Sequence, residues 1–435
     1  MKLKLHTQIF IALILAVIAG YLTGKDAALF GVSFYSIYDF FGTLFLNALK
    51  MIIVPLIMAS IISGIAGIGS GGAFGRLGGK TLIYYLSTSF LAIVVGLILV
   101  NLFAPGIIDG KPAGAVTGAL TADVSTVSDK IQGRGGGDVM EVFLRMVPPN
   151  IVSAAANGQM LGLIFFSLLF GYFMTRIGNT YAEHMYKFWN GTFEVMMQIT
   201  LFIMKFTPYG VFALVAKVVA DTDPGKFAEL AQSVGTFFIT VLLALAIHMF
   251  ITMPLILRFV AGVNPLRHFR AMAPALLTAF STASSSATLP MTMERVEKNA
   301  GVSNRTTSFV LPLGSTVNMD GTALYECVAA MFIAQAYGLE LSFTTQLTVV
   351  MLALLTSIGV AGIPSASLVA ISVILTSIGL PIEGIAMIYA VDRILDMCRT
   401  AVNVFSDSCG AVVVARSEGE TPLSDEVMQA AEEKA

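Results

Sequence analysis

The segment Ile385–Val414 is long and apolar enough to cross a bilayer, yet it carries charged side chains at Asp392, Arg393, Asp396, Arg399 and Asp407. One charged side chain near the bilayer centre costs about 2.5–3.5 kcal/mol on insertion scales. At about 100° per residue, Asp396, Arg399, Asn403 and Asp407 all lie within about 60° of Asp392, and only Arg393 lies well off this face. The spacing therefore predicts a membrane helix whose polar face lines an internal functional site.

Composition places this segment in a polytopic membrane protein. The 435 residues are 56% hydrophobic and 12% charged, whereas a soluble domain has about 25% charged residues. The net charge of −2 offers no basic surface for nucleic acid. The cysteines and histidines show no disulfide or metal-ligand spacing; they are Cys327, Cys398, Cys409, His6, His184, His248 and His268.

Six apolar stretches before residue 260 approach the 20 or so residues that a spanning helix needs. They are 7–24, 36–68, 81–104, 148–180, 190–219 and 230–258, and Asn157 and Gly158 interrupt the fourth. The first has no clear small-residue cleavage site, which favours a membrane helix over a signal peptide. Because Lys2, Lys4, Arg76 and Lys80 flank the N-terminus and the second loop, we expect both on the cytoplasmic side.

Two charge-free segments after residue 260 have polar centres. Ala271–Met293 contains six hydroxyl residues and a proline within 281–290, and the middle of Leu341–Ile382, Ser357–Ser367, is rich in Gly, Pro and Ser. Non-helical backbone at membrane depth is tolerated only where protein or water satisfies it. The pattern favours two re-entrant helical hairpins. The alternatives are one serine-rich helix for the first segment and two short helices for the second.

A further apolar segment, Thr306–Tyr337, is interrupted by the sequence NMDGT at 318–322. Asn, Asp and Gly are weak helix formers, so we expect the helix to break here. A break frees carbonyls that could bind a cation and amides that could bind an anion. Paired interrupted segments are the best sequence indication of a transporter's binding site.

Four motifs occur in order: the serines of Ser284–Ser286, NMDGTALYE at 318–326, AGIP at 361–364 and DRILDMCRTAVNV at 392–404. With them the chain resembles, over nearly its whole length, the glutamate/aspartate transporters of the dicarboxylate/amino acid:cation symporter family. The resemblance implies an all-α membrane protein with eight transmembrane helices and two opposed re-entrant hairpins. It also implies inverted repeats, an elevator-type mechanism, a homotrimer and a location in the cell (inner) membrane with cytoplasmic termini.

The resemblance also implies a division of the chain into a scaffold and a transport domain. Scaffold helices 1–2 fall in 1–80, helix 3 of the transport domain in 81–104, and an extracellular or periplasmic loop in 105–143. Scaffold helices 4–5, which make the trimer, fall in 144–222. The rest of the transport domain falls in 223–416, and an acidic cytoplasmic tail in 417–435.

An acidic amino acid offers two carboxylates and an ammonium, and a buried site must pair all three because unpaired buried charge is costly. The planar fork of Arg399 suits the side-chain carboxylate, and Asp396, three residues earlier, suits the ammonium. The other substrate contacts implied by the family motifs are Asn403, Thr400, Thr322, Ser285 and Ser284. The alternative is an ion-pair network that only locks helices together.

Sodium is a hard cation and takes oxygen ligands. The resemblance implies one sodium site at Asp407 and Asn318 with carbonyls near Gly314 and Asn403. A second would use carbonyls of Thr316, Ser357, Ile358 and Val360, and a third would use Asp320 with Asn318, Tyr85, Thr88 and Ser89. Sodium would also balance Asp320 and Asp407, for which the sequence shows no protein partner. Glu326 is a candidate proton carrier, and no organic cofactor is expected.

These features predict a symporter for L-glutamate and L-aspartate, driven by sodium with protons as a second candidate. A C4-dicarboxylate:cation symporter is the main alternative, but its substrate lacks the ammonium that Asp396 would pair. An intramembrane aspartyl protease using Asp320 is disfavoured because GxGD is absent and Arg399 would keep Asp396 ionised. A channel would need no opposing ion gradient. We therefore expect a transporter and not an enzyme, with an acidic amino acid, membrane lipid and other copies of the chain as partners.

Overall fold

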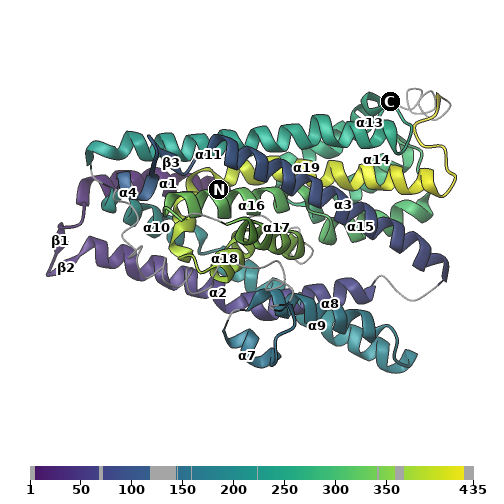
Figure 1. Ribbon diagram of the computed structural model, residues 1–435, viewed down its shortest axis with the longest axis horizontal. Coiled ribbons are helices and arrows are strands. Elements are labelled where there is room, and N and C mark those ends of the chain that lie inside the picture. The colour runs from purple at the N-terminus through teal and green to yellow at the C-terminus, as the bar shows by residue number, and fades with distance from the viewer. Residues whose placement is uncertain are drawn as a thin grey trace.

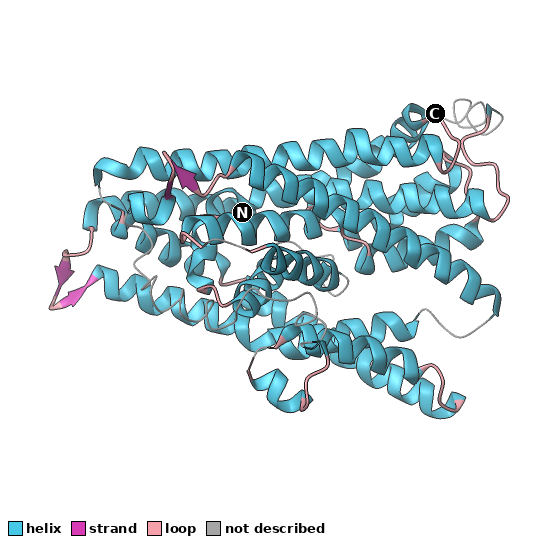
Figure 2. Ribbon diagram, in the orientation of Figure 1, coloured by secondary structure: helices cyan, strands magenta, loops and turns pink. Residues whose placement is uncertain are grey.

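The computed structural model describes residues 5–67, 72–117, 144, 146–157, 159–222, 224–339, 342–357 and 367–425. This part of the chain is almost entirely helical (Figure 2), so the predicted mainly α-helical class is confirmed. Two short antiparallel hairpins were not predicted: β1 (Ala28–Leu29) pairs with β2 (Val32–Ser33), and β3 (Ile107–Ile108) pairs with β4 (Lys111–Pro112). The β1–β2 hairpin projects from one end of the molecule, at the left of Figure 1.

The first half of the chain differs from the predicted spans at two places. Its helices are α1 (Leu5–Thr23), α2 (Phe34–Gly67), α3 (Gly72–Phe103), α4 (Ala113–Thr117), α7 (Ile151–Ala156), α8 (Met160–Met174), α9 (Asn179–Met204) and α10 (Thr207–Asp221). Helix α3 begins before the predicted residue 81. The predicted span 190–219 is not one helix, because α9 and α10 meet at an angle of 56°. Pro208, in the first turn of α10, lacks the N–H and the space to continue α9.

The second half begins with the turn η1 (Pro224–Lys226) and holds the segments that the motifs singled out. They are α11 (Phe227–Ile247), the π-helical turn η2 (His248–Thr252), α12 (Met253–Phe259), α13 (Pro265–Thr282), α14 (Ser285–Lys298), α15 (Asn304–Val317), α16 (Asp320–Ala336), α17 (Phe343–Ser357), α18 (Ser367–Ile378), η3 (Ile382–Met387) and α19 (Tyr389–Ser417). Helix α19 begins at Tyr389 because the 3-10 turn η3 occupies the start of the predicted segment.

The first serine-rich segment forms a helical hairpin and not a single helix. Helices α13 and α14 pack against each other and are joined at Ala283 and Ser284. Ala283 adopts the left-handed conformation with φ 49° and ψ 40°, which reverses the chain. The Ser284 hydroxyl then accepts a hydrogen bond from the amide of Ala287 at 3.2 Å and caps α14.

The second charge-free segment forms the helix pair α17 and α18, which also pack together. These helices have 15 and 12 residues, or about 22 and 18 Å at 1.5 Å per residue. Neither reaches the 30 Å or so of a bilayer core. Residues 358–366, including the AGIP motif, lie outside the described residues.

The predicted break in the next segment is present. Helix α15 ends at Val317, Asn318 and Met319 are non-helical, and α16 begins at Asp320. In the 148–180 segment the predicted interruption is also present, because Asn157 ends α7 and α8 follows. Gly158 lies outside the described residues.

Helix α3 packs against α19 and α17, and in Figure 1 it crosses α19 obliquely. Near the end of α3, Asn101 donates to the side chain of Gln346 in α17 at 3.1 Å. Near its start, Lys80 binds Glu418 at 2.6 Å, and Leu423 of the same tail donates to the Ala300 carbonyl between α14 and α15 at 2.8 Å. The pairs α13–α14 and α17–α18 therefore have their open ends toward opposite ends of α3.

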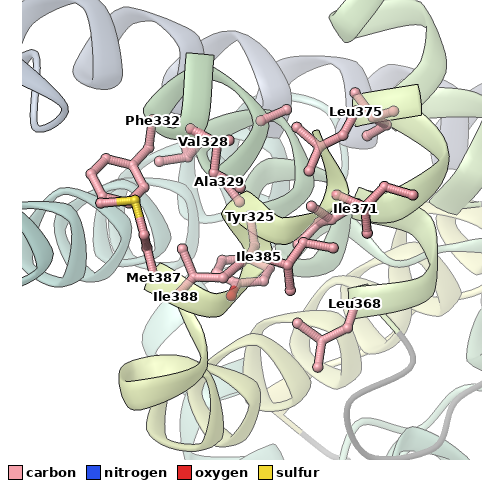
Figure 3. Packing of buried hydrophobic residues seen from close by; sticks show 14 of the residues in the cluster. Tyr325, Val328, Ala329, Phe332, Leu368, Ile371, Leu375, Ile385, Met387 and Ile388 are labelled. Carbon is pink, nitrogen blue, oxygen red and sulfur yellow. The ribbon is translucent and has the colours of Figure 1, made fainter. Parts of the chain in front are cut away.

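Three helices of the described chain are long and apolar enough to cross a membrane, namely Phe34–Ala66, Arg76–Phe103 and Phe227–Phe259, and the bent pair α9–α10 is a fourth. The chain is thus a multi-pass membrane protein, while the count of eight spans stays a prediction. Inside it, Phe332 and Val328 of α16 pack with Ile371 of α18 and Ile385 of η3 (Figure 3). This core packs α18 against α16, and α13 and α14 pack with α19 in a second apolar cluster.

Candidate functional site

The predicted polar face of α19 is buried inside the protein. Asp392, Asp396, Arg399, Asn403 and Asp407 are each at most 6% exposed. Arg393, which the periodicity places off this face, is partly exposed and lies 3.5 Å from Asp396. Because α19 packs on α13, α15 and α16, its polar face is enclosed by the hairpin and by the broken helix.

Arg399 lies at the centre of a group of charged and aromatic side chains. Its Nη2 contacts Asp396 Oδ1 at 2.7 Å and its Nη1 contacts Asp392 Oδ1 at 3.2 Å. The guanidinium carbon lies 3.8 Å from the centre of the Tyr325 ring, and the Tyr325 hydroxyl donates to Asp392 Oδ1 at 3.0 Å. The guanidinium is therefore fixed by two carboxylates at its edges and by an aromatic ring on its face.

The direct contact between Arg399 and Asp396 was not part of the predicted substrate arrangement, which gave each residue a separate partner. Both residues lie on α19, as does Asp392, so these ion pairs do not join two helices, and Tyr325 of α16 is the member of the group that comes from another helix. Arg399 Nε is buried and has no hydrogen-bond partner among the described residues. A buried donor of this kind is costly unless a further partner binds it.

Asn403 joins α19 to the first turn of α16. Its Oδ1 accepts from the amide of Gly321 at 2.8 Å, and its Nδ2 donates to the Thr322 hydroxyl at 3.0 Å. Gly321 is required here, because a Cβ at this position would lie 2.8 Å from the carbonyl oxygen of Arg399. The structure thus brings Asn403 and Thr322 together beside Arg399.

The remaining predicted substrate residues are Thr400 on α19 and two serines at the start of α14. The Thr400 hydroxyl donates to the carbonyl of Asp396 within α19 at 2.8 Å. Ser284 and Ser285 are buried at the start of α14, which packs along α19. Their side chains are therefore part of the hairpin tip, as the sequence predicts.

Three residues of the first predicted sodium site, Asn318, Asp407 and Gly314, are joined by hydrogen bonds from Asn318. Asn318 Nδ2 donates to Asp407 Oδ1 at 2.9 Å, and its backbone N–H donates to the Gly314 carbonyl at 2.9 Å. A Cβ on Gly314 would lie 2.5 Å from Asp407 Oδ1 and 2.6 Å from the Tyr85 hydroxyl. Tyr85 itself donates to the carbonyl of Val310 at 2.7 Å.

Asp320, of the third predicted site, has more partners than expected. Its Oδ1 lies 2.6 Å from the Ser89 hydroxyl and 3.3 Å from that of Thr88. Its Oδ2 lies 2.6 Å from the Ser406 hydroxyl and 3.0 Å from His248 Nε2. The expectation that Asp320 and Asp407 have no protein partner is therefore wrong.

For the second predicted sodium site the structure describes only Thr316 and Ser357. Their hydroxyls donate to Leu313 and Leu354 of their own helices, at 3.1 and 2.9 Å. Ile358 and Val360 lie outside the described residues, so this site stays a prediction.

Glu326, the candidate proton carrier, is fully buried in α16. Its Oε2 accepts from the Thr356 hydroxyl of α17 at 2.8 Å. Its Oε1 has no hydrogen-bond partner in the described part of the chain. Glu326 therefore connects the broken helix to the second helix pair at the end of α17.

The sequence analysis placed Asp392 on the polar face of α19 but gave no role to it or to Tyr325, His248 and Ser406. A signal was available for each of the four. Asp392 lies on the polar face of α19, Tyr325 lies inside the NMDGTALYE motif, and His248 is an ionisable residue within an apolar span. Ser406 lies about 40° from Asp392 at 100° per residue, and so on the same polar face.

The family model for the sodium:dicarboxylate symporter family matches residues 5–417 of the chain. A proton/sodium-glutamate symport protein of Bacillus caldotenax is 37% identical over 421 residues, which cover 96% of each chain. The proton/glutamate-aspartate symporter of Escherichia coli (strain K12) is 37% identical over 87% of this chain and 84% of its own. Excitatory amino acid transporter 2 of Homo sapiens is 37% identical over 86% and 72%. The chain thus belongs to the sodium:dicarboxylate symporter family and is a membrane transporter, not an enzyme.

Proposed function

We propose that this chain is a secondary symporter that takes up L-glutamate and L-aspartate together with sodium. The observation that carries the proposal is the buried guanidinium of Arg399, with a carboxylate at each of two edges and an Nε–H that has no hydrogen-bond partner among the described residues. A guanidinium has five N–H donors in one plane, so it can receive a substrate carboxylate while it keeps the contact with Asp392. Relatives named for glutamate or aspartate symport support the choice of substrate.

The ammonium of the substrate would pair with Asp396 as Arg399 turns toward the substrate carboxylate. Asn403 and Thr322 lie together beside Arg399 and suit the α-carboxylate. The amides at the start of α14, which packs on α19, are the further anion donors of this proposal, because amides and a helix N-terminus favour an anion. Each charge of the amino acid then has a partner, as a buried site requires.

The charge balance supports cation coupling. In the described part of this region, four aspartates are buried, namely Asp320, Asp392, Asp396 and Asp407, whereas the nearby guanidiniums are the buried Arg399 and the partly exposed Arg393. The substrate adds one more net negative charge. Sodium ions at the predicted sites would offset this excess, and Asp320 Oδ1 already lies beside the hydroxyl oxygens of Ser89 and Thr88.

The helices pack in two groups, as an elevator movement requires, and the homotrimer is proposed together with this movement. Helices α1, α2, α8, α9 and α10 pack mainly with one another, and α3, α11, α13–α17 and α19 form a second group. We assign the first group (1–80 and 144–222) to a trimeric scaffold and the second (81–104 and 223–416) to the moving transport domain. The opposed open ends of the two hairpins and their short helices support re-entrant hairpins, and with them the eight-helix family architecture.

We place both termini on the cytoplasmic side of the cell (inner) membrane. Arg76, Lys80, Arg267 and Arg416 all contact the segment after α19, so positive charge gathers at that end of the molecule. Positive charge marks the cytoplasmic side of membrane proteins. Tail residues beyond 425 lie outside the described residues.

The test is uptake of labelled aspartate and glutamate into proteoliposomes, with sodium and pH gradients imposed separately. We expect an inward sodium gradient to drive accumulation, and a pH gradient to add to it if Glu326 carries a proton. R399C should abolish uptake of acidic substrates while R393C retains it. Uptake that neither gradient drives would contradict the symporter proposal.

A C4-dicarboxylate substrate is the second candidate, favoured by the name of the matched family. It would leave the carboxylate of Asp396 without an ammonium and beside a like charge, which is unfavourable. Competition between labelled aspartate and unlabelled succinate separates the two. We expect an excess of succinate to leave aspartate uptake largely intact, whereas full competition would favour the dicarboxylate.

A further inference from the structure

His248 lies at an irregular point in an otherwise continuous helix. The span runs from Phe227 to Phe259, and its π-helical turn begins at His248. A π turn holds one more residue than an α-helical turn, shifts the direction of the side chains around it and is frequent at functional sites. Here the shifted side chain is fully buried, and its Nε2 lies 3.0 Å from Asp320 Oδ2.

The carboxylate of Asp320 has a full set of donors. Ser89 and Thr88 contact Oδ1, whereas Ser406 and His248 contact Oδ2. An ionised carboxylate offers about four lone-pair positions, so these four groups occupy them. A sodium ion can reach Asp320 only if at least one of the donors gives way.

The four donors differ in what they can do when a cation arrives. A hydroxyl can rotate its hydrogen away and offer a lone pair to the ion, so Ser89, Thr88 and Ser406 can change from donors to ligands. The imidazole cannot, because an Nε2 that faces a carboxylate must carry its hydrogen. His248 is therefore the fixed donor of the four.

His248, the fixed donor, binds Oδ2, one of the two carboxylate oxygens of Asp320. Oδ2 is bound to His248, while Oδ1 faces the Thr88 and Ser89 hydroxyls, and Thr88 also lies 3.5 Å from Asn318 Oδ1. Oxygen atoms that could surround a hard cation are thus gathered on the Oδ1 side. The other ring nitrogen, Nδ1, is buried without a hydrogen-bond partner in the described chain, so the ring is held mainly by Asp320.

We propose that His248 is a positioning residue for the cation at Asp320. Its Nε2–H fixes the rotation of the carboxylate so that Oδ1 points at the Thr88, Ser89 and Asn318 oxygens. The inference rests on the proposed sodium coupling and adds to it a residue that makes no contact with the ion. Groups that orient a metal ligand typically change metal affinity by about 10- to 100-fold when they are removed.

The experiment compares H248L, H248Q and H248N with wild type in proteoliposomes. Leucine removes the donor, glutamine keeps an N–H near the Nε2 position, and asparagine places its N–H nearer Nδ1. We expect H248L and H248N to raise the sodium concentration for half-maximal aspartate uptake by about 10- to 100-fold. H248Q should stay within about threefold of wild type, and aspartate KM at saturating sodium should hardly change in any variant.

A second readout does not depend on transport. Sodium should raise the melting temperature of the purified wild-type protein, and H248L should shift the sodium concentration needed for this effect by the same factor. H268L is the matched control, because His268 is equally buried and has one partner, the Ser408 hydroxyl at 2.9 Å. We expect its sodium dependence to match wild type. If H248L does not fold, the proposal is tested by comparing the sodium concentration for half-maximal uptake between H248Q and H248N.

The outcomes separate this inference from the proposed function. If wild-type uptake is independent of sodium, the proposed function fails and this inference fails with it. If D320N loses sodium dependence while H248L and H248N keep that of wild type, only the role of His248 is wrong. Equal losses in H248Q and H248L would also overturn it, because the N–H would then not matter.

Discussion

At the scale of single residues, Arg399 is held by two carboxylates, while its Nε–H has no hydrogen-bond partner among the described residues. Its side chain is 1% exposed, so its charge must be balanced inside the protein. Asp392 and Asp396 do this, and the Tyr325 ring adds a cation–π contact worth up to about 2 kcal/mol when desolvated. Because these partners hold the guanidinium plane and leave Nε unpaired, the residue is pre-organised for one more anionic partner.

Arg399→Lys tests whether the planar fork, and not only the positive charge, binds the substrate. Lysine keeps the charge but cannot make two parallel hydrogen bonds. Loss of one charged hydrogen bond is worth about 1.5–3 kcal/mol, so we expect aspartate KM to rise by about 10- to 100-fold. The control is Arg393→Lys on the same helix, which should stay within about threefold because Arg393 is partly exposed. A wild-type KM for the Arg399 variant would contradict the role.

Tyr325→Phe removes the hydroxyl that donates to Asp392 but keeps the ring below the guanidinium. A hydrogen bond to a charged group contributes about 1.5–3 kcal/mol, so substrate affinity should fall by about 10-fold or more. Tyr389→Phe is the matched control, because the buried Tyr389 hydroxyl has no partner among the described residues. Binding should be measured calorimetrically for both. Equal affinities in the two variants would show that the Asp392 contact does not position Arg399.

At the scale of elements, the site is built where regular helices stop. The α15–α16 break brings Asn318 toward Asp407 and the amide of Gly321 toward Asn403. The left-handed Ala283 ends α13 and places Ser284 at the start of α14. The π turn directs His248 to Asp320. Each irregularity therefore directs a polar group into the space beside α19.

Sequence periodicity could predict some of these elements but not others. The polar face of α19 follows from a repeat within one helix, and the α15–α16 break follows from weak helix formers at adjacent positions. The contact between His248 and Asp320 joins residues 72 apart and depends on a π turn, for which the local sequence holds no rule. The bend between α9 and α10 was missed because the apolar pattern outweighed the breaking effect of Pro208.

Gly321→Ala tests the close approach of α16 to α19. The added Cβ would lie 2.8 Å from the Arg399 carbonyl oxygen, and backbone cannot move aside as a side chain can. Overpacking of this kind costs about 1–3 kcal/mol, so we expect a lower melting temperature and weaker aspartate binding. Gly64→Ala in α2 is the control, because its Cβ would meet nothing within 4 Å. Alanine there should stabilise the helix slightly. Unchanged binding in the Gly321 variant would refute this close contact.

At the scale of the whole molecule, the segment after α19 joins elements that are far apart in sequence. Glu418 binds Arg76 and Lys80 of α3 at 2.7 and 2.6 Å. Glu420 accepts from the amide and hydroxyl of Ser303 and from the Thr306 hydroxyl, at 2.6–2.8 Å, and so caps α15. The sequence alone suggested only a solvated acidic end, because nothing local indicates which distant donors a carboxylate will meet.

Glu420→Gln tests this connection through its pH dependence. Burial alone would raise the pKa of Glu420, but the hydrogen bonds from Thr306 and Ser303 outweigh it and lower the pKa below its usual 4.5. A carboxyl whose folded pKa is lowered stabilises the fold above its unfolded pKa and loses this effect as the pH falls through the folded pKa. At pH 7 we expect Glu420→Gln to lose about 1–2 kcal/mol, since the group is partly exposed.

The melting temperatures of wild type and Glu420→Gln in detergent should therefore differ most at pH 7 and converge below about pH 4. Glu294→Gln, which loses an exposed contact with Lys298 at 3.0 Å, should melt close to wild type at pH 7. If the difference in melting temperature between wild type and Glu420→Gln stayed constant from pH 7 to pH 3.5, the charge of Glu420 would not be what holds the tail to α15. In that case only the tail's other contacts, such as Leu423 with Ala300, would connect it to the hairpin.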